Sequence, residues 1–216
     1  MGTVAPPRAD AEEALKERDP TRELDHRFRN ILAMIQAMAQ QTLRGAPGAE
    51  DFGAAFMGRL RALSGAYELV ARNMTGGFRD GVLLQEAFDQ ALAPLGQTVR
   101  HRITTCGPDV RLGADLGMTL QLAVHELASN ALQHGALGAK DGQVDVGWRA
   151  QDGELIVIWV ERGGPPAAAP ERRGFGLRLV QDGLPRTLGG KAQMSFGPEG
   201  LELTLKAPLS DVLALC

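Results

Sequence analysis

The feature that most constrains this chain is a pair of apolar repeats with helical spacing, separated by a short segment that resembles a turn. The first repeat has a 4-3-4-3-4 spacing and consists of Leu24, Phe28, Ile31, Ile35, Met38 and Thr42. The same spacing returns after residues 45–49, at Phe56, Leu60, Leu63, Tyr67, Val70 and Met74. Residues three and four apart share one face of a helix, so the pattern predicts two long helices joined as an antiparallel hairpin.

A two-helix hairpin of this kind has a continuous apolar face that it cannot cover by itself. A second copy of the chain would cover it in a dimeric four-helix bundle, and we expect this homodimer. The alternative is that the apolar face packs against the rest of the same chain.

A second unit follows the Thr75–Gly77 segment, and its pattern alternates between helices and strands. We expect helices near 84–95, 116–134 and 175–188, and strands near 98–104, 143–148, 155–160, 192–196 and 201–207. This order predicts an α+β sandwich with a mixed, mostly antiparallel sheet and helices on one face. The expected organisation is a flexible tail over 1–20, the hairpin over 21–76 and the second domain over 77–216.

Composition excludes several classes of protein. The chain has 216 residues, of which 44% are hydrophobic, so it can bury a full core. A net charge of -3 argues against nucleic-acid binding, which depends on an excess of Lys and Arg. Charges interrupt every apolar stretch before the ~20 residues that span a bilayer, and the N-terminus lacks the apolar core of a signal peptide. We therefore expect a cytoplasmic protein without membrane partners.

His26 is the first candidate for chemistry. At about 100° per residue it lies opposite the apolar face of the first helix, so it is expected to face water. Asp25 is its neighbour, and Asn30 lies one turn further on the same face. A neutral imidazole is a nucleophile, and a carboxylate beside it can orient the ring and accept its proton. The alternative is an ordinary surface histidine.

The second candidate is the segment 124–134, in which Glu126, Asn130 and Gln133 fall on one helical stripe. An amide oxygen such as that of Asn130 suits Mg²⁺ carrying phosphates, and Glu126 can polarise an attacking group or a water. Taken alone, a Glu and an Asn four residues apart also fit an ordinary polar helix face.

The third candidate is the segment 158–166 together with 174–178. Glu161 leaves a strand, where a carboxylate can accept a hydrogen bond from an adenine amino group. Gly174 and Gly176 stand at an expected helix start, where free backbone amides can bind phosphate. Ordinary loop glycines are the alternative.

The order of these three segments resembles the HWE subgroup of bacterial histidine kinases, over residues ~21 to 208. That subgroup is named for a histidine in its N box and a Trp-x-Glu in its first glycine box, which correspond to His125, Trp159 and Glu161. The resemblance implies a two-component histidine kinase whose ATP-binding domain has the Bergerat fold of gyrase, Hsp90 and MutL. By residue pattern alone, His125 and Trp159 are expected to be packing residues.

The resemblance also implies roles. His26 is the expected phosphoacceptor, assisted by Asp25, with Glu126 as the N-box acid, Asn130 as the Mg²⁺ ligand and Glu161 as the acid that recognises adenine; residues 165–173 would form a short ATP lid. The expected nucleotide-binding residues are Asn130, Gln133, His134, Glu161, Gly163, Gly164, Gly174, Phe175, Gly176 and Arg178. The implied partners are the receiver domain of a response regulator and a separate sensor protein.

Gln133 departs from the family pattern, since many N boxes carry Lys or Arg there. The loss of this cation weakens the case for efficient ATP use, although Arg173 or Arg178 can compensate. One alternative is therefore a phosphotransfer adaptor that docks a receiver domain but has lost ATP binding. A different Bergerat enzyme, either an ATP-hydrolysing machine or a serine kinase, is disfavoured because residues 24–74 carry a histidine-bearing hairpin.

Overall fold

The computed structural model describes residues 20–45, 48–74, 81–170 and 173–212. Two 26-residue helices open it, α2 (Pro20–Gly45) and α3 (Ala49–Met74), as the two apolar repeats predict. The expected tail over residues 1–19 lies outside the described residues. None of the helices in the described ranges is long and apolar enough to cross a membrane.

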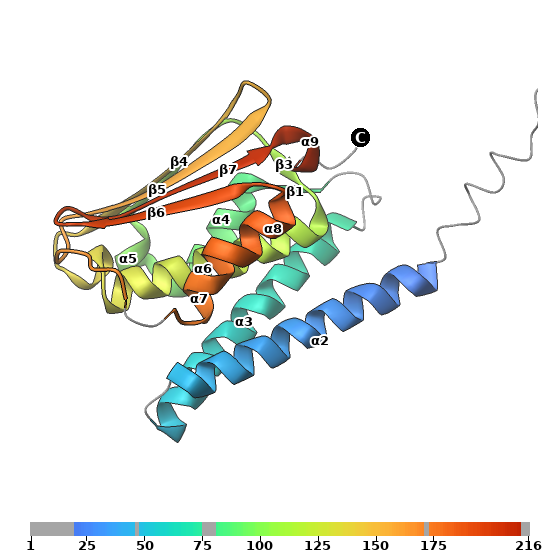
Figure 1. Ribbon diagram of the computed structural model, residues 1–216, viewed down its shortest axis with the longest axis horizontal. Coiled ribbons are helices and arrows are strands. Elements are labelled where there is room, and N and C mark those ends of the chain that lie inside the picture. Colours follow the sequence, from blue (N-terminus) through green and yellow to red (C-terminus); the bar gives the residue numbers. More distant parts are fainter. Residues whose placement is uncertain (1–19, 46–47, 75–80, 171–172, 213–216) are drawn as a thin grey trace, which may run out of the picture.

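Helices α2 and α3 converge at the turn between them and splay apart toward their other ends (Figure 1). On the apolar face of the hairpin, Met38, Leu63 and Val70 are buried, at 0%, 5% and 3% exposed. Phe28 and Tyr67, which the repeats assign to the same face, are 62% and 56% exposed. The chain thus covers only part of this face by itself, and cover by a second copy stays a prediction.

A five-stranded sheet forms the second unit. Its strands are β2 (Ile103–Cys106), β4 (Gln143–Gln151), β5 (Glu154–Arg162), β7 (Gly200–Pro208) and β6 (Lys191–Gly197), in that spatial order. β2 pairs with β4 in parallel and the other three pairs are antiparallel. The α+β prediction with a mixed, mostly antiparallel sheet is confirmed. A small sheet of β1 (Val82–Leu83) and β3 (Arg111–Leu112) was not expected from the sequence.

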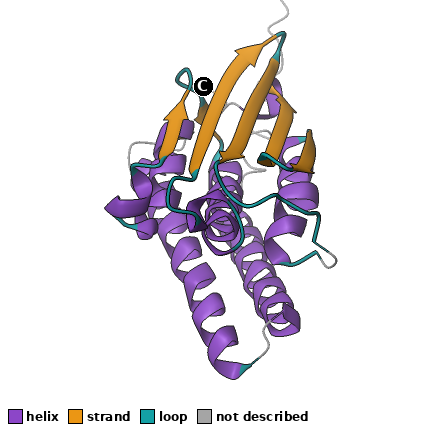
Figure 2. Cartoon of the chain, turned by 90° about the vertical axis from the view of Figure 1, so that its left-hand side faces the viewer, coloured by secondary structure: helices purple, strands orange, loops and turns teal. Residues whose placement is uncertain are grey.

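Helices cover one face of the sheet (Figures 1 and 2). The long helix is α6 (Ala114–Gln133), beside α4 (Leu84–Leu92) and α8 (Leu184–Leu188). The expected helix over 175–188 contains α7 (Phe175–Arg178) and the π-helical turn η3 (Leu179–Gly183) before α8. Short elements complete the fold, namely η1 (Ala93–Leu95), α5 (Gln97–Arg100), η2 (Ala136–Gly138) and α9 (Leu209–Val212).

The expected strand over 98–104 is wrong in its first half. Gln97–Arg100 is a helical turn, and the strand begins at Ile103. Gly96 explains the difference, because its φ of 74° lets the chain reverse after η1 and start a new turn. Val99, a β-branched residue that favours strands, instead packs against the core from this turn.

Helix α6 is buried on two sides. Its predicted apolar face, which includes Leu120 and Leu127, belongs to the main core beneath the sheet. On another side Leu122 forms a smaller cluster with three residues from α2, α3 and α7, namely Met38, Leu63 and Phe175. Burial of an aliphatic or aromatic side chain contributes about 1.5–3 kcal/mol, so this cluster fixes the turn end of the hairpin against α6.

Candidate functional site

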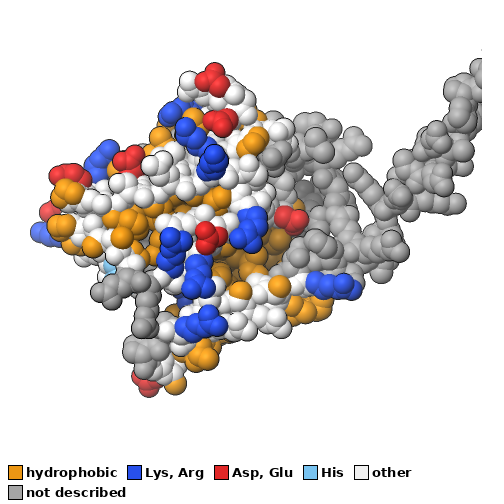
Figure 3. Space-filling view, in the orientation of Figure 1, with side chains coloured by type: hydrophobic (Ala, Val, Ile, Leu, Met, Phe, Trp, Pro, Cys, Tyr) orange, Lys and Arg blue, Asp and Glu red, His pale blue; other side chains and the backbone are white. Residues whose placement is uncertain are grey.

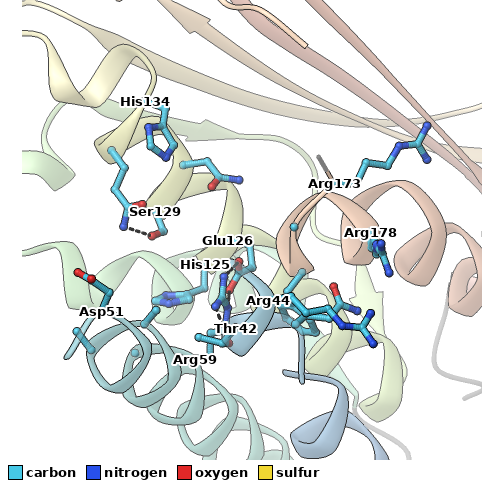
Figure 4. A pocket seen from close by; sticks show the side chains of 18 residues that line it. Thr42, Arg44, Asp51, Arg59, His125, Glu126, Ser129, His134, Arg173 and Arg178 are labelled. Atoms are coloured by element: carbon cyan, nitrogen blue, oxygen red, sulfur yellow. Dashed lines mark hydrogen bonds and ion pairs between the residues drawn. The ribbon is translucent and has the colours of Figure 1, made fainter. Parts of the chain in front are cut away.

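A cavity of about 1440 Å³ lies between the turn end of the hairpin and the helices α6 and α7. Three parts of the chain line it. The lining residues are Gln41, Thr42, Arg44, Asp51, Ala54, Ala55, Gly58 and Arg59 from the hairpin, His125, Glu126, Ser129, Asn130, Gln133 and His134 from α6 and its end, and Arg173, Gly174, Phe175 and Arg178. Figure 4 shows the polar side chains of these segments facing one another.

The polar stripe of α6 forms one wall of this cavity. Glu126, Asn130 and Gln133 all line it, as their spacing predicts. Glu126 is 4% exposed, whereas Asn130 is half-buried and Gln133 is exposed. Gln133 Nε2 donates only a long hydrogen bond of 3.4 Å to Ser129 Oγ. The wall therefore offers one buried carboxylate and a half-buried amide to whatever occupies the cavity.

Arg59 on α3 forms an ion pair with the Glu126 carboxylate on α6. Its Nε donates to Oε1 at 2.7 Å and its Nη2 donates to Oε2 at 2.8 Å, so the pair is bidentate. The remaining nitrogen, Nη1, donates to Thr42 Oγ1 on α2 at 2.8 Å. The guanidinium carbon also lies 5.4 Å from the ring centre of Phe175, within the range of a cation–π contact.

The opposite wall is cationic. Arg173 and Arg178 flank Gly174 and Phe175 at the start of α7, and Arg44 faces them from the end of α2 (Figure 4). In Figure 3, Lys and Arg side chains gather on the face of the molecule around α7 and the adjoining end of α2. These three arginines supply positive charge to the cavity, where Gln133 supplies none.

Gly176 permits the close approach of α7 to α6. A Cβ at this position would lie 2.7 Å from both the Cβ and Oε2 of Glu126, which no ordinary side-chain contact allows. Gly176 is buried at the first turn of α7. Its lack of a side chain therefore sets the distance between the expected glycine box and the N-box acid.

His125 lines the cavity beside Glu126, on the side that faces α3 (Figure 4). Burial lowers the pKa of His125, the Glu126 carboxylate acts in the opposite direction, and the Arg59 cation lowers it further. The ring is therefore held neutral at pH 7. It packs at the junction between α6 and the hairpin, which agrees with a packing histidine.

Glu161 lies outside the lining of this cavity. It stands near the end of β5 and is 4% exposed. Its Oε2 accepts a hydrogen bond from the Ala136 backbone N–H at 2.9 Å, and its Oε1 accepts one from Trp159 Nε1 at 3.3 Å. Trp159 is buried as expected, and in addition it orients this carboxylate.

The segment 135–142, which follows α6, encloses the Glu161 carboxylate. A Cβ at Gly135 would overlap Glu161 Oε2, so glycine is required for the chain to pass there. Gly163 and Gly164 follow β5, and Gly164 packs against the Ala136 backbone. The first glycine box thus contacts η2, and neither of its glycines lines the cavity.

Arg102 fixes the same segment through hydrogen bonds to its backbone carbonyls. Its Nη1 donates to the carbonyls of Ala139 and Gly142 at 2.6 and 3.1 Å, and its Nη2 donates to the carbonyl of Leu137 at 2.8 Å. A cation that bonds carbonyls just past a helix end opposes the negative end of the helix dipole. One side chain thus fixes three points of segment 135–142.

The expected phosphoacceptor is not brought to the cavity. His26 and Asp25 lie in α2, but their side chains are outside those the structure describes. The α2 residues that line the cavity are Gln41, Thr42 and Arg44. At 1.5 Å of rise per residue, the backbone of His26 lies about 24 Å along the helix from Thr42.

Sequence reasoning missed the hairpin wall of the cavity. Arg59 and Thr42 belong to the helices of a repeat that predicts packing, and nothing near Arg59 indicates a partner 67 residues away. Thr42 was expected as a member of the apolar face, and its hydroxyl serves both as an acceptor for Arg59 and as a donor to the Met38 carbonyl at 2.6 Å. The only local sequence signal for this wall is Thr42, a polar residue at the last position of an otherwise apolar repeat.

Metal binding at this site would depend on the nucleotide. Within the described ranges, no three His, Cys, Asp or Glu residues stand close enough to hold an ion. Asn130 offers one amide oxygen to the cavity, and both Glu126 oxygens are bonded to Arg59. The residues fit Mg²⁺ that arrives bound to phosphates and takes one protein ligand, and they do not fit an all-protein metal cage.

Comparison with known proteins identifies relatives. Residues 23–109 match the model of the HWE histidine kinase family. The chain is 38% identical over 207 residues to a blue-light-activated histidine kinase of Brucella anthropi, and 36% identical over 194 residues to one of Brucella ovis. These alignments cover 94% and 88% of this chain but only 40% and 39% of the relatives. The chain thus spans about two-fifths of the length of these relatives.

Solved structures with the same fold include the Erythrobacter litoralis blue-light activated histidine kinase. The TM-score is 0.61 at 22% identity, covering 97% of this chain and 63% of that chain. The histidine kinase domain of the same protein gives a TM-score of 0.57 at 18% identity, covering 84% and 95% of the two chains. At these identities the likeness establishes the fold.

The buried Glu161 carboxylate makes a prediction about pH. Burial raises its pKa, against the opposing effects of the Ala136 and Trp159 hydrogen bonds. The folded state therefore holds this proton more tightly than the unfolded state, so the stabilisation is complete below the unfolded pKa and is lost as pH rises through the folded one. We expect wild type to lose stability relative to Glu161→Gln over that window, measured by urea unfolding at a series of pH values. Parallel curves for the two proteins would contradict it.

Proposed function

Since this chain belongs to the HWE histidine kinase family, we propose that it phosphorylates itself on His26 using Mg-ATP and passes the phosphoryl group to an aspartate of a response regulator. The single observation that carries the proposal is the cavity that Asn130 of the N box lines together with Arg173, Arg178 and Arg44. An amide oxygen beside several arginines suits a metal-bound triphosphate, which no net-negative cavity would hold.

The proposed reaction proceeds in two transfers. In the first, the unprotonated ring nitrogen of His26 attacks the γ-phosphorus, the bond to the bridging oxygen breaks, and ADP leaves with the electron pair. The other ring nitrogen gives up its proton, for which Asp25 is the nearest acceptor in the sequence. In the second, a receiver carboxylate oxygen attacks the same phosphorus and the N–P bond breaks with its electron pair going to the ring nitrogen. A proton returned by Asp25 or by water then restores neutral His26.

The chain's own residues would act on the nucleotide by position and charge. Asn130 would bind a Mg²⁺ that neutralises the phosphates when it is present. Arg173 and Arg178 would contact the phosphates from the lid side, in place of the cation that Gln133 does not supply. Glu161, held by Ala136 and Trp159, would accept a hydrogen bond from the adenine amino group on its remaining lone pairs.

The proposed partners follow from the same reading. A receiver domain would meet His26 on α2, and the exposed apolar residues at the splayed end of the hairpin, Phe28, Leu32 and Tyr67, suit a second copy of the chain. Because the relatives are much longer than this chain, a separate sensor or a sensory segment elsewhere would supply the stimulus.

Autophosphorylation with labelled ATP tests the proposal. We expect label on wild type that is labile to acid and stable to base, background label on His26→Ala, and a rate about 100-fold lower for Asn130→Ala, the scale on which removal of one charge-stabilising group acts. His101→Ala, which removes an exposed histidine on the surface, is the matched control and should label as wild type does. Full labelling of His26→Ala would exclude the phosphoacceptor assignment, and full activity of Asn130→Ala would exclude the metal-ligand assignment.

A second candidate is a phosphotransfer adaptor without ATP binding. The observation that favours it is the Glu126 carboxylate, whose two oxygens are both bonded to Arg59. A calorimetric titration of wild type with Mg-ATP separates the two candidates. We expect saturable binding at micromolar to millimolar concentration that Asn130→Ala weakens. The absence of binding, combined with acceptance of a phosphoryl group from a phosphorylated receiver, would establish the adaptor.

A further inference from the structure

The bridge between Arg59 and Glu126 joins the two halves of the fold. Arg59 belongs to α3 of the hairpin and Glu126 to α6 beneath the sheet. Their side chains are 19% and 5% exposed, so the ion pair is largely shielded from water. A bidentate pair in such a place has a fixed geometry, and the loss of one partner leaves a buried charge without compensation.

The bridge occupies Glu126, the acid expected to polarise an attacking group or a water. Both Glu126 oxygens accept from Arg59, so the carboxylate cannot turn toward a water or an attacking group while the bridge is in place. The Thr42 hydroxyl binds the same guanidinium, which ties α2 into the bridge. In this arrangement the turn end of the hairpin, and not the His26 end, faces the cavity.

The rigidity of α2 makes the arrangement incompatible with transfer within one chain. The helix is continuous from Pro20 to Gly45, so it cannot fold back between Thr42 and His26. A separation of about 24 Å along the axis keeps the acceptor far from the cavity. For His26 to reach a phosphate held at Asn130 in the same chain, the hairpin has to move relative to α6.

From these observations we infer that Arg59 is an interdomain latch. It holds the kinase in a resting arrangement by binding Glu126, Thr42 and the face of Phe175, and it must release Glu126 before His26 is phosphorylated in cis. This inference rests on the proposed function. It adds that the basal rate is limited by the population of the unlatched arrangement, which an input to the hairpin would raise.

The latch is tested with three variants in the whole chain. Arg59→Ala removes the bridge. Arg59→Lys keeps the charge but loses the planar fork, so its rate of His26 phosphorylation should lie between those of wild type and Arg59→Ala. Arg61→Ala, which removes an exposed arginine two residues further on α3, is the matched control. The readouts are the initial rate of His26 phosphorylation at saturating Mg-ATP, and amide hydrogen exchange over 54–63 and 118–130 without nucleotide.

We expect Arg59→Ala to phosphorylate His26 about five- to tenfold faster, the size of a typical coupling between two sites. Its amides in both segments should exchange faster, while Arg61→Ala matches wild type in both readouts. A slower or unchanged rate for Arg59→Ala overturns the latch, since a residue that binds substrate or assists transfer lowers the rate when removed. If no protein forms phosphohistidine, the proposed function fails instead, and unchanged exchange in Arg59→Ala still overturns the latch.

A second inference rests on Arg102, and on separate contacts. Arg102 lies just before β2 and bonds the carbonyls of Leu137, Ala139 and Gly142. The segment it fixes contains Ala136, whose N–H binds Glu161. The structure thus assigns Arg102 a positioning role: it sets the segment against which the proposed adenine acceptor is oriented, without touching the nucleotide.

Arg102→Ala and Arg102→Lys test this role. We expect the Kd for Mg-ATP to rise about tenfold in Arg102→Ala, which corresponds to about 1.4 kcal/mol. The maximal rate of His26 phosphorylation should be retained and Arg102→Lys should recover part of the affinity. Arg149→Ala, which removes an exposed arginine on β4, is the control.

An unchanged Kd in folded Arg102→Ala, with wild type binding normally, overturns the positioning role. A loss of maximal rate with unchanged Kd overturns it too. If wild type does not bind Mg-ATP, the proposed function fails first.

Discussion

The whole arrangement depends on a charge that is buried at the centre of the molecule. Glu126 lies on α6, and this helix is covered by the sheet on one side and by the hairpin on another. A carboxylate in that position is very unfavourable without a partner. Arg59 supplies the partner from α3, so the electrostatic requirement of one residue on α6 fixes where the hairpin docks. The apolar contacts of Met38, Leu63 and Phe175 then form in this docked position.

The second buried carboxylate is satisfied in a different way. The oxygens of Glu161 accept hydrogen bonds from the Ala136 amide and the Trp159 indole, which are both uncharged donors. Two neutral donors offset burial only in part, which is why the pKa of Glu161 stays raised. The donors to Glu161 are uncharged, whereas the guanidinium of Arg59 balances the charge of Glu126 and fixes its orientation. The two acids therefore differ in what they can do in this arrangement.

The sequence predicts those features that repeat at short range. The spacing of Leu120 and Leu127 predicts the buried face of α6, and the stripe of Glu126 and Asn130 beside it does line a cavity. The α+β class follows from the alternation of helical and strand periodicity along the chain. The strand expected at 98–104 fails because Val99 packs into the core equally well from a helical turn. The repeats place Phe28 and Tyr67 on an apolar face, but a repeat does not tell whether the same chain or a second copy covers it.

Contacts between distant segments could not be predicted, and here they decide the chemistry. Arg59 is one of many exposed-looking cations in the sequence, and only the packing of α3 on α6 brings it to Glu126. Because α2 is continuous, it holds His26 about 24 Å from Thr42, which lies at the bridge. A helix of fixed length cannot present both ends to one cavity. Docking through Thr42 and the proposed phosphorylation of His26 in the same chain are therefore alternative uses of one helix, and in the proposed latch the ion pair at its near end selects between them.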